Sequence, residues 1–133
     1  MELSRLCEMQ GISGREELVR MAIFRECAEV LGEENVKIDR TGNVIAHKAC
    51  RKADAPRVMV AAHMDEVGFI VTGIDEKGFL SFAPVGGVQP EVTGGRMVLV
   101  GDDAIPGMVG CKPVHLCDEK ERCDPGKLSA MKI

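Results

Sequence analysis

The sequence predicts a mixed α/β fold whose second half is mainly β. Apolar residues recur at helical steps up to Leu31, whereas from Asn35 onward they alternate with a period of two. After His63 the apolar runs are short and are separated by tight turns that contain glycine and proline. Alternating helix and strand patterns are typical of an α/β domain, and a run of short strands is typical of a small barrel or sandwich.

Two helices are predicted at the amino-terminal end. The first covers residues 1–9, and the second follows the two glycines of the stretch GISGREE. Ser13 and Glu16 have the spacing of a capping box, in which each side chain accepts a hydrogen bond from a backbone N–H group at the helix start. Gly32 suits the position after the helix end. The apolar stripe expected to face the core is Val19, Ile23, Cys27 and Val30.

Three short strands are expected before residue 64. The first two lie within residues 35–39 and 43–49, and the turn DRTGN between them supplies glycine and asparagine for a hairpin. The third, at residues 57–63, follows a polar loop. Its continuous apolar lead-in VMVAA indicates a buried central strand of an open sheet.

The second half predicts two pairs of strands and an irregular tail. The stretch GFIVTGIDEKGFLSFAPV indicates a hairpin whose turn is Asp75–Gly78, and RMVLVG and AIPGMVG indicate two more strands. The stretch from His115 onward is polar and contains one possible helical turn. Its last residues, LSAMKI, look like a strand without a partner.

Composition excludes several classes of function. The formal net charge is −4, and no basic stripe offers a surface that would neutralise nucleic-acid phosphates. No apolar run approaches the ~20 residues that cross a bilayer. The first residues lack a basic segment followed by an apolar one, so no secretory signal is visible and we expect a cytoplasmic protein.

The six cysteines are scattered, without a Cys-x-x-Cys pair, and in a cytoplasmic chain they are expected to be reduced thiols. A zinc site formed by Cys111, His115, Cys117 and Cys123 is conceivable. Its spacings, however, do not match those of structural zinc sites. His47 and His115 have no convincing partner and are expected to be structural or exposed.

The chemistry of the chain is expected at His63 and Asp65, which interrupt its most strand-like run. Buried charge is costly unless it is paired or bound to a metal. Residues two apart on a strand share a face, so the carboxylate can accept a hydrogen bond from the imidazole while the other ring nitrogen binds a divalent metal. Asp65 could instead bind the metal itself, or the strand could simply be emerging into water.

Three stretches taken together resemble the M42 family of metallo-aminopeptidases, the glutamyl-aminopeptidase branch whose members are sometimes labelled endoglucanases. These are GISGREELVR, VAAHMDEVGFIVTGIDEKGFL and IPGMVGCKPVHL, in the order expected for the family. The resemblance implies that residues 1–66 are the amino-terminal part of a zinc-peptidase-like α/β catalytic domain. It implies that residues 67–133 belong to a β-rich, PDZ-like dimerisation domain that is incomplete at its carboxyl-terminal end.

The resemblance also implies roles and partners. His63 matches the family's first metal ligand, and Asp65 matches the carboxylate that orients it and supports catalysis. Family members act on peptides, hold two zinc or cobalt ions, and form dimers that build dodecamers. The family's other ligands and its general base follow the dimerisation insert, beyond Ile133. This chain alone is therefore expected neither to hold the two metals nor to be active.

Two other functions remain open at this point. The β-rich part from Val67 onward could be a module for self-association or peptide binding, since a strand can add to an open sheet edge. Glycoside hydrolysis is the other, following the endoglucanase label. It needs two carboxyl groups roughly 5–10 Å apart, whereas Asp65 and Glu66 are adjacent and would face opposite ways on a strand, and the chain has no Trp or Tyr to stack on a sugar.

Overall fold

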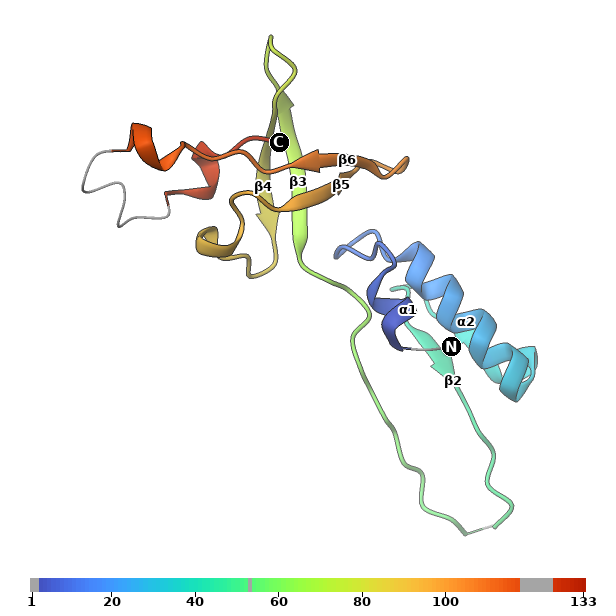
Figure 1. Cartoon of the computed structure of the whole chain (residues 1–133). Coiled ribbons are helices and arrows are strands. Elements are labelled where there is room, and N and C mark those ends of the chain that lie inside the picture. The colour runs from blue at the N-terminus through green and yellow to red at the C-terminus, as the bar shows by residue number, and fades with distance from the viewer. Residues whose placement is uncertain (1–2, 53, 118–125) are drawn as a thin grey trace. The chain divides into compact units, whose positions relative to one another are not determined.

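A computed structural model describes residues 3–52, 54–117 and 126–133 of the chain (Figure 1). The chain divides into two compact units, an amino-terminal unit, Met1–Glu66, and a carboxyl-terminal unit, Val67–Ile133. The first combines helices with a small sheet, and the second is built mainly from strands. The predicted mixed α/β character is thus confirmed.

The amino-terminal unit packs one long helix against a hairpin. Its helices are α1 (Leu3–Cys7) and α2 (Glu17–Leu31), and its strands are β1 (Val36–Ile38) and β2 (Val44–Ala46), which pair antiparallel. Helix α2 lies along both strands (Figure 1). The helix ends where expected, because Gly32 has a φ of 88° and donates its N–H to the Ala28 carbonyl.

Only part of the predicted α2 stripe faces the core. Val19 is buried, as is Val36 of β1, whereas Val30 is 75% exposed. The prediction for Val30 is therefore wrong: the helical period places it on the stripe, but its side chain lies in solvent. The capping box is also wrong, because α2 begins at Glu17 without a side-chain cap.

The predicted strand at residues 57–63 does not form. This segment is irregular in the structure, and Val58, Met59 and Val60 are 83–92% exposed. A strand exists only where a neighbour satisfies its N–H and C=O groups, and no part of the described chain pairs with these residues. The apolar composition indicates that this segment favours burial. It does not indicate which strand would pair with it.

The carboxyl-terminal unit contains two antiparallel hairpins. Strands β3 (Gly68–Ile74) and β4 (Leu80–Val85) form the first, and β5 (Met97–Val100) and β6 (Ile105–Met108) form the second. The Asp75–Gly78 turn of the first hairpin is confirmed: Asp75 accepts the backbone N–H groups of Lys77 and Phe79. All four strands of this unit lie where the sequence predicts them.

A small core joins the two hairpins to the end of the chain. Phe82 of β4, Val109 and Met131 are buried together, and Phe69 of β3 meets Phe82 edge-on with ring centroids 4.6 Å apart. Residues 128–130 form a 3-10 turn, and Ile133 exchanges backbone hydrogen bonds with Leu80. The prediction that LSAMKI is a strand without a partner is therefore wrong, because its last residues pair with β4 and with Gly110.

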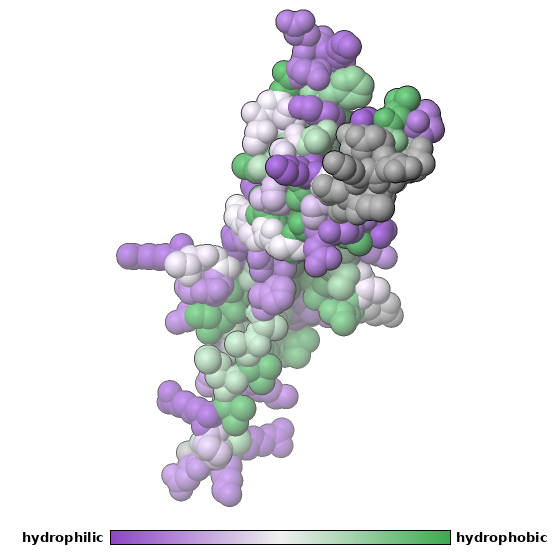
Figure 2. All heavy atoms as spheres, turned by 90° about the vertical axis from the view of Figure 1, so that its left-hand side faces the viewer, coloured by the Kyte–Doolittle hydropathy of each residue, from purple (hydrophilic) through white to green (hydrophobic). Residues whose placement is uncertain are grey.

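Large apolar side chains are exposed in both units, and Figure 2 shows apolar spheres at the surface among polar ones. On β5–β6 they fall on one face. Met97, Leu99 and Met108 are 58–63% exposed, and Met97 stands opposite Met108 in the register. Val98, which points the other way, packs against the core. No helix within the described ranges is long and apolar enough to cross a membrane.

The core predicts unequal effects for two methionine substitutions. Met131→Ala should destabilise the carboxyl-terminal unit by about 2–5 kcal/mol, because it leaves a cavity beside Phe82 and Val109. Met97→Ala removes the same atoms from an exposed position and should change stability little. Urea unfolding of the two variants and the parent measures the difference. Equal losses of stability would show that Met131 does not contribute to a packed core.

Candidate functional site

The His63 ring lies against its neighbour Asp65. Its Nδ1 atom is 3.0 Å from the Asp65 carbonyl oxygen and 3.1 Å from the Asp65 Oδ1 atom. Both oxygens only accept hydrogen bonds, so Nδ1 carries the proton of the neutral ring. The lone pair of a neutral imidazole then resides on Nε2. Because the side chain is 86% exposed, nothing in the described part of the amino-terminal unit covers that nitrogen.

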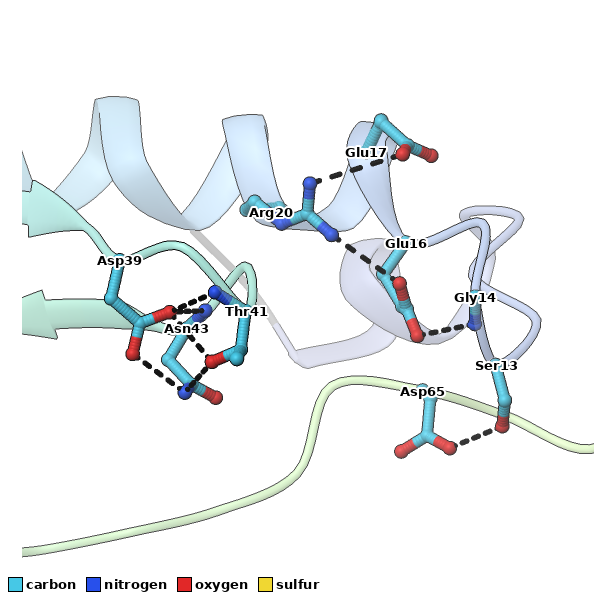
Figure 3. A network of polar contacts seen from close by, with 9 residues as sticks. All are labelled: Ser13, Gly14, Glu16, Glu17, Arg20, Asp39, Thr41, Asn43 and Asp65. Atoms are coloured by element: carbon cyan, nitrogen blue, oxygen red, sulfur yellow. Dashed lines mark hydrogen bonds and ion pairs between the residues drawn. The ribbon is translucent and has the colours of Figure 1, made fainter.

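The second oxygen of Asp65 is held by Ser13, whose hydroxyl donates to Oδ2 (Figure 3). This hydrogen bond is the main reason why the pKa of Asp65 is lower than that of a free aspartate; a smaller contribution comes from His63, and partial desolvation opposes it. Asp65 is therefore an ionised acceptor at neutral pH. One carboxylate thus links Ser13 to the His63 ring.

The backbone brings these residues together. Glu66 donates its N–H to the Gly11 carbonyl at 2.8 Å, and its carboxylate accepts the Gly11 N–H at 3.1 Å. Ile12 and Glu66 form an isolated parallel bridge. Gly11 also lies close against α2, because a Cβ atom there would lie 2.7 Å from a methyl group of Val19.

The start of α2 anchors the other side of Ser13. Gly14 donates its N–H to the Glu16 carboxylate at 2.6 Å, and Arg20 binds the second oxygen of Glu16 at 3.3 Å (Figure 3). Arg20 also lies 3.9 Å from Glu17. The loop between α1 and α2 is thereby fixed to the first turn of α2.

The β1–β2 turn completes this side of the unit. The Asp39 carboxylate accepts hydrogen bonds from the backbone and side chains of Thr41 and Asn43, as expected for the predicted hairpin turn. Gly42 has a φ of 92°, and a Cβ atom there would lie 2.7 Å from the Arg20 guanidinium. Glycine at this position therefore lets the turn lie directly against Arg20.

These elements surround an open cavity of about 170 Å³. Its walls are Glu16 and Arg20 of α2, the Thr41–Asn43 turn, and residues 62–65. The cavity places the His63 ring beside polar groups from three segments of the amino-terminal unit. It has the size of a small-molecule subsite rather than of a complete ligand pocket.

Comparison with known proteins identifies the family of this chain. A sequence model of the M42 glutamyl aminopeptidase family matches residues 42–133, which include the His63–Asp65 pair and the whole carboxyl-terminal unit. The chain belongs to the M42 aminopeptidase family. The resemblance seen in the sequence is therefore confirmed.

Relatives of this M42 chain are similar along nearly all of its length. The lysyl aminopeptidase of Pyrococcus furiosus is 39% identical over 126 residues, which are 93% of this chain and 35% of that protein. The structure of the TET1 peptidase of Pyrococcus horikoshii matches with a TM-score of 0.79 at 31% identity, covering 98% of this chain and 38% of that one. A structure from Thermotoga maritima titled endoglucanase matches with a TM-score of 0.76 at 34% identity, covering 99% and 37%.

The M42 chain spans about a third of the length of these relatives. The possible metal ligands in the described part of this chain are correspondingly few. Within residues 3–52, 54–117 and 126–133, no group of three or more His, Cys, Asp or Glu side chains is placed to hold a metal ion. A catalytic zinc normally has three protein ligands. The described residues therefore do not form a complete metal centre, and the Nε2 atom of His63 is an exposed imidazole nitrogen.

The other histidines and the cysteines lie apart from this site. His47 follows β2 and donates its backbone N–H to the Asn35 carbonyl, and His115 lies in a 3-10 turn. Cys111 and Cys117 are free thiols that do not form a metal-binding group with His115 in the described part of the chain. Cys123, the fourth residue of the zinc site considered from the sequence, lies outside the described residues.

Ser13 is the site residue that the sequence reasoning missed. It had been assigned to the cap of α2, whereas the structure places its hydroxyl on Asp65, 52 positions along the chain. A hydrogen bond from a hydroxyl to an ionised carboxylate is stronger than one between neutral groups, which favours the contact with Asp65. The signal in the sequence was the serine's position between Gly11 and Gly14, where the backbone can turn away from the helix.

The Asp39 turn generates a prediction about pH. Hydrogen bonds from the Asn43 side chain first, then from the Asn43 backbone and Thr41, hold the pKa of Asp39 well below its usual range. A lowered pKa in the folded state stabilises the fold above the unfolded value of about 3.9, and this stabilisation is lost as pH falls through the folded value. We expect the carbon-13 carboxyl signal of Asp39 to titrate well below pH 3.9, and Asn43→Ala to raise its midpoint. A parent midpoint near 3.9 would contradict the hydrogen-bonded turn.

Proposed function

We propose that this chain is the amino-terminal part of a metal-dependent aminopeptidase, a hydrolase that releases amino-terminal residues from peptides. The observation that carries the proposal is the His63–Asp65 pair of an M42 family member, in which the ring has its proton on Nδ1 and its Nε2 lone pair free. An imidazole in this state can bind a divalent cation without first losing a proton.

We assign His63 the role of a metal ligand and Asp65 that of the carboxylate that orients it and supports catalysis. The complete protein would hold two zinc or cobalt ions, and such ions activate water and polarise the scissile carbonyl. This chain contributes an oriented imidazole and an open cavity beside it. Because it offers one ligand of that set, we expect it to be inactive by itself, and we expect the complete enzyme to work in the cytoplasm.

We propose that residues 67–133 belong to a PDZ-like dimerisation domain, and that the complete protein is a homo-oligomer. The solved structure of a TET1 peptidase is titled a dodecamer, which supports this for the family. In this chain the support is the apolar face of β5–β6, formed by Met97, Leu99 and Met108. An apolar face opposite the packed side of a hairpin is typical of an interface.

Exposed apolar side chains also favour association. Val58, Met59 and Val60 are 83–92% exposed in the amino-terminal unit. Contiguous apolar side chains in solvent favour burial against further protein, either the rest of the polypeptide or other copies.

Glycoside hydrolysis is the less favoured alternative, although one similar structure is titled an endoglucanase. The two adjacent carboxylates are both engaged: Asp65 binds Ser13 and His63, and Glu66 binds the Gly11 N–H. Neither is free to protonate a glycosidic oxygen. Peptide hydrolysis is therefore the function that the site supports best.

Metal removal tests the proposed reaction. The complete protein that contains this chain should release amino-terminal residues from short peptides, should lose activity in EDTA, and should regain it with Zn²⁺ or Co²⁺. His63→Ala should lower kcat/KM by at least about 100-fold, the upper end of the loss caused by removing a group that merely orients a metal ligand. His47→Ala is the matched control and should be nearly neutral. Undiminished turnover in EDTA would overturn the metal mechanism.

A charge on the β5–β6 face tests the association. Leu99→Lys should weaken self-association of the chain, because the new ammonium group would be buried in an apolar interface. Leu3→Lys places the same charge at an exposed position of α1 and serves as the control. Sedimentation at several concentrations measures both. If neither variant shifts the distribution of species, the β5–β6 face is not the interface.

A further inference from the structure

We propose that Ser13 is a positioning residue of the site: its hydroxyl holds the Asp65 carboxylate in the orientation in which Asp65 receives the Nδ1–H group of His63. The ring is thereby presented with Nε2 free. The purpose of the oriented ring depends on the proposed function, whereas the orientation itself depends only on these three residues. The loop before α2 would then be part of the site rather than a connection between helices.

The first step of the argument is the number of anchors on the carboxylate. A carboxylate attached by a single sp³–sp² bond rotates over a broad range, so one hydrogen bond leaves its plane poorly defined. In the structure Oδ1 meets the His63 ring, and Oδ2 receives the Ser13 hydroxyl. Two partners on two oxygens fix the plane of the carboxylate. The Nδ1–H group of His63 is shared between this fixed Oδ1 and the Asp65 carbonyl oxygen, so the carboxylate supplies one of the two acceptors that orient the ring.

The second step is that Ser13 is itself anchored on both sides. Before it, Gly11 exchanges two hydrogen bonds with Glu66, the residue after Asp65. After it, the Gly14 N–H group is bound by Glu16, which Arg20 holds in turn. The hydroxyl is therefore supplied from a fixed loop, at the position where the Asp65 carboxylate needs a donor.

The third step excludes the common structural roles of a serine before a helix. Ser13 does not cap α2, and the residue is exposed, so its side chain contributes little to packing. Its described hydrogen bond is the one to Asp65. The hydroxyl of Ser13 binds the distant Asp65 carboxylate and not the nearby end of α2. We therefore relate its role to the His63 ring, which the same carboxylate binds.

The site contains a serine, a histidine and an aspartate, the residue types of a nucleophilic triad. Ser13, Asp65 and His63 are not arranged as one. In a triad the serine hydroxyl is bonded to the imidazole, which removes its proton, and the aspartate lies behind the ring. Here the hydroxyl and the ring bind opposite oxygens of the carboxylate. Nothing in this order activates Ser13 as a nucleophile, so its role is to position Asp65.

The test reads the state of the His63 ring in the chain itself. With nitrogen-15-labelled histidine at a pH of about 8, NMR distinguishes the Nδ1–H tautomer of a neutral imidazole from the Nε2–H tautomer. The parent should show mainly the Nδ1–H form at His63. Ser13→Ala should reduce that preference, because it releases the carboxylate and leaves only the Asp65 carbonyl oxygen as a fixed acceptor. Ser13→Thr, which keeps the hydroxyl, should retain it. Ser4→Ala, which removes an exposed hydroxyl from α1, is the matched control.

Thermal unfolding of the same variants separates positioning from stability. Ser13→Ala that changes the tautomer while unfolding like Ser4→Ala supports the proposal. Unchanged tautomers in Ser13→Ala overturn it, whatever the stability. If Ser13→Ala unfolds too early to measure, Ser13→Cys provides a side chain of similar size with a weak donor and should give the same loss of the Nδ1–H preference.

A second readout in the complete enzyme distinguishes this inference from the proposed function. Ser13→Ala should lower kcat by about 10-fold with little change in KM, at the low end of the effect of residues that support a metal ligand, and Ser13→Thr should restore it. Full kcat in Ser13→Ala together with a strong loss in His63→Ala would overturn the role of Ser13 and leave the aminopeptidase assignment intact. Full activity in His63→Ala would overturn that assignment, while the tautomer experiment still decides the role of Ser13.

Discussion

The Asp65 carboxylate is the point at which the local structure of the amino-terminal unit and its chemistry meet. Its two oxygens join the loop before α2 to the His63 ring, and Glu66, the next residue, joins the same loop through the backbone. If this junction were broken, the 63–66 segment would have no fixed relation to α2. The orientation of the ring is thus a consequence of how two distant segments pair, and it does not require a bound cation.

This dependence explains which parts of the structure could be predicted from the sequence. The β3–β4 hairpin and the Gly32 helix end are local, because turn residues and the period of the apolar residues specify them within a few positions. The His63–Asp65 contact is also local, since the residues are two apart. Ser13 could not be found in this way, because its partner is 52 residues distant and its nearby alternative, the helix cap, obeys an equally good rule.

Most of the errors concern the neighbours of a segment rather than its own apolar pattern. Val30 lies at the helical step that the pattern indicates, and Val58 and Val60 form the apolar run of a central strand, yet all three are exposed. A sequence pattern records the environment for which a side chain is suited. It does not record whether the neighbouring element belongs to the same stretch of chain. For Met131 the error is the opposite one. The sequence predicts that its segment has no partner, yet Met131 is buried, because Ile133 pairs with Leu80 at the edge of β4.

The same reasoning relates the exposed apolar residues to the incomplete donor set. A metal centre that draws ligands from several segments cannot be assembled by the 63–66 segment alone. Likewise, the apolar segment 57–63 cannot form a buried strand without neighbours that satisfy its N–H and C=O groups. Both the apolar run and the incomplete ligand set favour contact with further protein. The two lie next to each other, since the apolar run leads directly into His63. Burial of that run would also lower the dielectric constant around the ring and strengthen its hydrogen bond to Asp65. The Ser13–Asp65 link holds the ring in position without that burial, so the orientation of the imidazole is a property of the amino-terminal unit itself.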